Sequence, residues 1–87
     1  MDVQLQAIQF LSETVVDLNL LNGLKNSLTS KLNGVLASLE IGQDDTAMNQ
    51  LQAFINEVYA QSGKEISGDD AADLVAAAEA LVATIES

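Results

Sequence analysis

Residues 67–86 read SGDDAADLVAAAEALVATIE. The segment opens like a capping box, in which Ser67 caps the start of a helix and Asp70 reaches back to it, and Ile66 stands before it as a hydrophobic staple. Apolar residues then recur at steps of three or four, which places them on one helix face: Ala71, Leu74, Ala78, Leu81 and Ile85, widened by Val75 and Val82. The segment therefore predicts an amphipathic helix over 68–86.

Three earlier segments show the same spacing, and they predict helices over 3–18, 21–41 and 45–62. Gly42 and Gly63 follow the second and third of these segments, where a glycine favours a left-handed C-terminal cap. The links between the segments are short, so consecutive helices run in opposite directions. The fold class expected is all-α, a small bundle of about four antiparallel helices.

The chain has 87 residues, which is enough for one domain with a modest core. Its few aromatic residues include Phe10 and Phe54, which we expect to fill the core that leucine, valine, isoleucine and alanine build. Gly23 and Gly34 interrupt the second helical pattern at a cost of up to about 1 kcal/mol each relative to alanine. Close contact with a neighbouring helix would explain them.

Thirteen acidic residues stand against three lysines, which gives a formal charge of −10. Such a surface repels phosphate, so we expect neither nucleic-acid binding nor adhesion to anionic membranes. No apolar run approaches the roughly 20 residues that span a bilayer, so membrane insertion is not expected. The acid excess is interpreted as solubilising.

Catalysis is not expected, because histidine and cysteine are both absent and the adjacent carboxylates stand at helix starts, where capping explains them. We therefore predict no enzyme, no catalytic residue, no cofactor and no defined metal site. Asp69, Asp70 and Asp73 cluster within one helical turn, but they lack the loop pattern of an EF-hand. Cation binding there is expected to be weak and nonspecific.

Two longer stretches carry a family resemblance: residues 24–32, LKNSLTSKL, and residues 47–58, AMNQLQAFINEV. Together with Gly42, residues 62–64 and residues 71–75, they resemble the FIMAH-type helical domain over about residues 20–86. The resemblance implies a small accessory module of large secreted or cell-surface proteins of bacteria and archaea, many of which are carbohydrate-active enzymes or proteases. It carries no catalytic residue.

The setting follows from that resemblance and from the start of the chain, which lacks a secretory signal. We expect residues 1–87 to form one domain excised from a larger protein, located outside the cell or on its surface; a cytoplasmic location stays open. The expected function is a non-catalytic accessory or interaction module. Its partners would be other domains of the parent protein or another protein.

Several polar residues lie beside the predicted apolar stripes, and we interpret them as structural rather than ligand-binding: Asn26, Asn49, Gln50 and Asn56, together with the capping Ser67. Side-chain amides in such positions satisfy backbone groups and fix register. Tyr59 stands one step off its stripe. We expect it to be partly buried, with a partner contact as the sharper alternative.

Two alternatives remain. An acyl or peptidyl carrier protein would attach its prosthetic group at Ser27, although Asn26 replaces the aspartate of the usual Asp-Ser-Leu motif. A self-associating module would use the helices at 3–18 and 68–86, the second of which is rich in alanine, and would form a weak homodimer. The interaction surface expected for docking or self-association includes Tyr59, Val75, Val82 and Glu79.

Overall fold

The computed structural model describes residues 2–86, with side chains from residue 5 onward. It contains α1 (Asp2–Asp17), α2 (Asn22–Glu40), α3 (Asp44–Gln61) and α4 (Gly68–Glu86). The predicted all-α class is confirmed, and every predicted helix end lies within one residue of the observed one. No described helix combines the length and the apolar character that crossing a bilayer requires.

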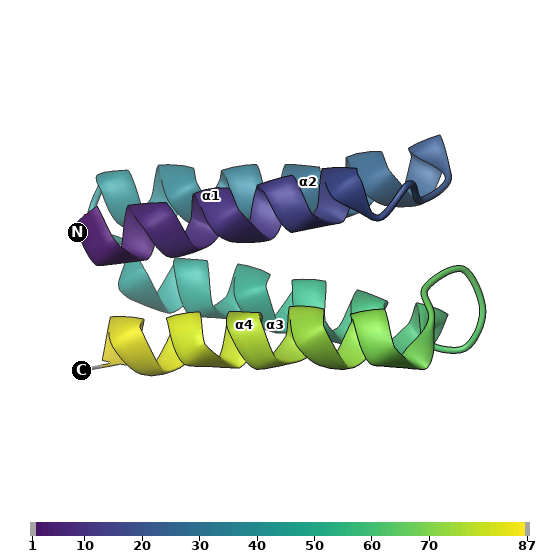
Figure 1. The fold of residues 1–87 in the computed structure, drawn as a ribbon. Coiled ribbons are helices and arrows are strands. Elements are labelled where there is room, and N and C mark those ends of the chain that lie inside the picture. Colours follow the sequence, from purple (N-terminus) through teal and green to yellow (C-terminus); the bar gives the residue numbers. More distant parts are fainter. Residues whose placement is uncertain (1, 87) are drawn as a thin grey trace.

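The four helices run up and down in antiparallel order (Figure 1). Each helix packs against two others: α2 against α1 and α3, and α4 against α3 and α1. Figure 1 shows α1 and α4 in front and α2 and α3 behind them, so the bundle is square in section. The start of α1 and the end of α4 lie at the same end of the bundle as the α2–α3 turn.

The core lies along the bundle axis and is built almost wholly from aliphatic side chains, with Phe54 fully buried among them. Phe10, which we expected in the core, is 61% exposed. The reason is rotational: at about 100° per residue, Ile8, Leu11 and Val15 point inward and Phe10 falls on the outer flank of α1. The prediction for Phe10 was wrong, because apolar character alone does not place a residue on the inner face.

The end of α2 is closed by a Schellman motif around Gly42, whose φ of +80° confirms the predicted left-handed cap. The Gln43 N–H donates to the Ser38 carbonyl at 2.8 Å, and the Gly42 N–H donates to the Leu39 carbonyl at 3.1 Å. Asn19 has a φ of +58° after α1, a conformation that asparagine tolerates better than most residues. These turns let the chain reverse within a few residues.

The α3–α4 link is fixed by hydrogen bonds within the turn and by one buried side chain. Gly63 adopts a φ of +78°, and its N–H donates to the Ile66 carbonyl at 2.8 Å. Ile66 is buried in the core, as a hydrophobic staple requires. Ser67 Oγ accepts a hydrogen bond from the Asp70 N–H at 3.1 Å, so the serine cap is present. The return bond from Asp70 is absent from the hydrogen bonds of the described residues.

Candidate functional site

A polar cluster joins the middle of α2 to the end of α3. Ser27 and Lys31 lie one turn apart on α2, and Glu57 faces them from α3. Ser27 Oγ donates to the two Glu57 carboxylate oxygens at 2.9 and 3.0 Å. Lys31 Nζ donates to Ser27 Oγ at 3.0 Å and forms an ion pair with Glu57 Oε1 at 2.9 Å. The three side chains thus form a closed ring.

A second contact joins α2 and α3 nearer the turn. Ser38 is buried to 6% exposure, and its Oγ donates to Gln50 Oε1 at 3.0 Å. Gln50 can reach Ser38 because Gly34 lies beneath it: a Cβ at position 34 would lie 2.9 Å from Gln50 Nε2. Gly34 therefore permits close helix contact, as we expected, whereas a Cβ at position 23 would meet no atom within 4 Å.

The other polar residues that we interpreted as structural make fewer contacts. Asn56 lies on the surface of α3, where its Oδ1 accepts a hydrogen bond from Gln52 Nε2 at 3.1 Å. Asn26 and Asn49 are exposed, and the described hydrogen bonds include none from their side chains. The amide that joins two helices is Gln50, and it bonds a serine hydroxyl rather than a backbone group.

The Ser27 ring does not suit nucleophilic catalysis. A serine nucleophile needs a base that takes its proton and an open path for substrate. Here the Lys31 ammonium donates to Ser27 Oγ, which leaves that lysine unable to act as a base toward it, and Glu57 is paired with the same ammonium. Ser27 is also only part-exposed and lies within α2. Attachment of a carrier prosthetic group at Ser27 would remove the hydrogen bonds that its hydroxyl donates to Glu57.

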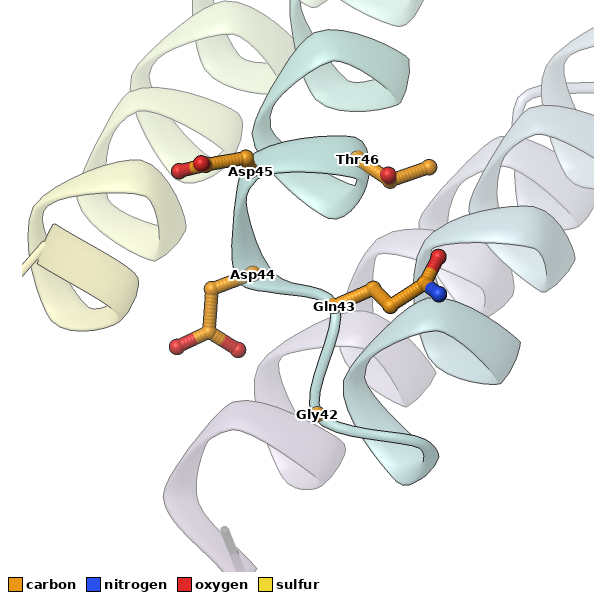
Figure 2. A pocket seen from close by; sticks show the side chains of 5 residues that line it. All are labelled: Gly42, Gln43, Asp44, Asp45 and Thr46. Carbon is orange, nitrogen blue, oxygen red and sulfur yellow. The ribbon is translucent and has the colours of Figure 1, made fainter.

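An open hollow lies at the α2–α3 turn and is lined by residues 42–46 (Figure 2). In Figure 2 the carboxylates of Asp44 and Asp45 point to one side of the turn, whereas Gln43 and Thr46 point to the other. Both carboxylates stand in the first turn of α3, where they balance the positive end of the helix dipole. The lining residues therefore do not converge on a common point.

Carboxylates elsewhere in the described chain do not converge either. No three Asp or Glu side chains with described positions come close enough together to hold a metal ion. Asp69 and Asp73 are exposed on α4, and Asp70 is half-buried, with its backbone N–H bound to Ser67.

The predicted interaction surface needs correction. Val75 is only 5% exposed and belongs to the core, and Val82 is half-buried against it, because both widen the inner stripe of α4. Glu79 is exposed. Tyr59, which we expected to be partly buried, is 59% exposed, so its ring is available to a partner. The exposed aromatic residue that sequence reasoning missed is Phe10.

The Ser27–Lys31–Glu57 ring was also missed. Ser27 and Lys31 carry a signal, since residues four apart share a helix face. Nothing local to α2 points to Glu57, however, which is 30 positions from Ser27. Finding it requires the rotation and register of α3 against α2.

Comparison with known proteins gives one match. The FIMAH domain matches residues 6–83 of the 87. No curated protein and no solved structure matches the chain. The match spans parts of all four helices and includes both stretches that carried the resemblance, residues 24–32 and 47–58. The chain therefore belongs to the FIMAH domain family.

Proposed function

We propose that this chain is a non-catalytic docking module, which binds other domains of a larger secreted or cell-surface protein. FIMAH domains are accessory helical domains of larger proteins, which supports the setting. The location outside the cell is part of the proposal and rests on the family.

One observation carries the docking role: large apolar side chains are exposed to solvent, whereas the reactive polar side chains at the α2–α3 contact bond to one another. Phe10 and Tyr59 are both more than half exposed, as are Val16, Leu21 and Ile41. Ser27, Lys31 and Glu57, by contrast, bond to one another. Exposed aromatic side chains are the residues that most often dominate binding energy at protein interfaces.

The test uses the chain and the neighbouring domains of its polypeptide, produced separately and titrated against each other by isothermal calorimetry. Docking predicts saturable binding that Phe10→Ala or Tyr59→Ala weakens, with unchanged helix content by circular dichroism. Absence of binding up to about millimolar concentration, where the free energy of association is only about −4 kcal/mol, would refute the proposal. A parallel incubation with coenzyme A and a phosphopantetheinyl transferase should leave the mass unchanged; an adduct on Ser27 would favour the carrier alternative.

A further inference from the structure

The tripeptide Leu-Asn-Gly occurs twice in the chain, at residues 21–23 and at residues 32–34. The first copy spans the start of α2, and the second lies in the middle of the same helix. α2 begins at the end of the bundle away from the α2–α3 turn (Figure 1). Because the local sequence is the same, a difference in reactivity between Asn22 and Asn33 would come from the structure around them.

An asparagine that precedes a glycine can lose its side-chain amide without an enzyme. The glycine backbone nitrogen gives its proton to water and attacks the asparagine Cγ; the N–Cγ bond forms, the Cγ–Nδ2 bond breaks, and ammonia leaves with a proton taken from water. Water then opens the resulting succinimide ring. Cleavage of the new N–Cγ bond gives aspartate, and cleavage of the original peptide bond gives isoaspartate. Glycine favours ring closure because it has no Cβ to obstruct the approach.

Helical backbone opposes this reaction at Asn33. Ring closure requires rotation of the asparagine ψ out of the helical range. In the middle of α2 the Gly34 N–H is paired with the carbonyl four residues before it, so the rotation would break helix hydrogen bonds on both sides. Gly34 is also packed beneath Gln50, whose Nε2 would lie 2.9 Å from an added Cβ.

Little opposes the reaction at Asn22. The first N–H groups of a helix have no acceptor within it, and in α2 the pairing begins at Lys25, whose N–H donates to the Leu21 carbonyl at 2.9 Å. Leu21 makes no side-chain cap bond that would hold this end of the helix. Asn22 and Gly23 are exposed, and a Cβ on Gly23 would meet no atom within 4 Å. Helix ends of this kind open at low cost.

We infer that Asn22 is a site of spontaneous deamidation, with water as the co-reactant, and that α2 protects Asn33 from the same reaction. The product adds one negative charge to the formal charge of −10. That charge lies in the first turn of α2, which holds no acidic residue, and the aspartate form balances the positive end of the helix dipole there. The inference does not depend on the docking function.

The test follows the whole chain at mildly alkaline pH by mass spectrometry, with and without urea. Cleavage after the lysines places Asn22 and Asn33 on different peptides, and fragmentation of each peptide assigns the modified residue. In the folded chain we expect Asn22 to react at least about tenfold faster than Asn33, because only the helix start opens readily. In urea, where the helices are unfolded, the two residues should react at the same rate. Incubation in heavy-oxygen water should label the product at residue 22.

A pair of variants tests the role of the Gly23 nitrogen. Gly23→Ala should slow the reaction at Asn22 about tenfold, whereas Gly68→Ala, at another open helix start, should leave its rate unchanged. Equal rates at Asn22 and Asn33 in the folded chain would overturn the inference. So would an unreactive Asn22 in the folded chain, or a rate at Asn22 that Gly23→Ala does not change.

Discussion

Gly34 and Gln50 give the sharpest test of how α2 meets α3. In the middle of a helix, glycine is about 1 kcal/mol less favourable than alanine, so Gly34→Ala should stabilise α2 if nothing stands in its way. A Cβ at position 34, however, would lie 2.9 Å from Gln50 Nε2 and 3.3 Å from Gln50 Cδ. The glutamine must then move, and Ser38 loses its acceptor.

The balance can be estimated from these contacts. Moving Gln50 leaves the buried Ser38 hydroxyl without its partner, which costs about 1–3 kcal/mol. Because this loss exceeds the helix gain, Gly34→Ala should lower the free energy of unfolding by about 1 kcal/mol. In a Gln50→Ala background the obstacle is gone, and the same substitution should raise that free energy by about 1 kcal/mol. The coupling between the two positions is therefore about 2 kcal/mol.

Urea denaturation of the four proteins of this double-mutant cycle, followed by far-ultraviolet circular dichroism, measures the coupling. Gly23→Ala is the matched control, because Gly23 lies in the same helix and a Cβ added there would meet no atom within 4 Å. This substitution should leave the free energy of unfolding unchanged or raise it in both backgrounds. If Gly34→Ala stabilised the original chain as much as the Gln50→Ala chain, the two sites would be independent. The close approach of α2 and α3 at Gly34 would then be refuted.

Three further predictions concern the caps and the core, and thermal unfolding measures each of them. Ser67→Ala should lower the free energy of unfolding by about 1 kcal/mol, because the Asp70 N–H loses its acceptor. Ser30→Ala, on the exposed side of α2, should leave it unchanged. Equal effects of the two substitutions would contradict the role of Ser67 as a helix cap. Gly42→Ala should cost about 1 kcal/mol, because its φ of +80° strains any residue with a Cβ; an unchanged stability would show that the turn relaxes. Phe54→Ala should lower the free energy of unfolding by about 3–5 kcal/mol, and Phe10→Ala should lower it by less than about 0.5 kcal/mol. A large loss of stability for Phe10→Ala would show that Phe10 is part of the core.

The helices and their ends could be predicted because the signals for them are local. A stripe of apolar residues at steps of three and four depends only on the helix itself, as do the glycine caps at Gly42 and Gly63. The burial of Phe54 follows from its place in the middle of such a stripe. Phe10 could not be placed in this way, because its apolar side chain stands off the stripe of α1 and only packing decides how far a flank is covered.

Contacts between helices could not be predicted, because they depend on register. Ser27 meets Glu57, and Ser38 meets Gln50, only for one rotation and one offset of α3 against α2. A shift by one turn, about 5.4 Å, would separate both pairs. The sequence of either helix alone does not indicate that offset.

The residues that carried the family resemblance have a physical role in this register. Ser27 and Lys31 come from the first stretch and Gln50 and Glu57 from the second, and all four join α2 to α3. The resemblance therefore describes how one helical hairpin is held together, rather than what it binds. Phe10 on α1 and Tyr59 on α3 are exposed, and both lie outside the two stretches. Binding studies on this chain should therefore begin at these two exposed aromatic side chains rather than at the contacts between α2 and α3.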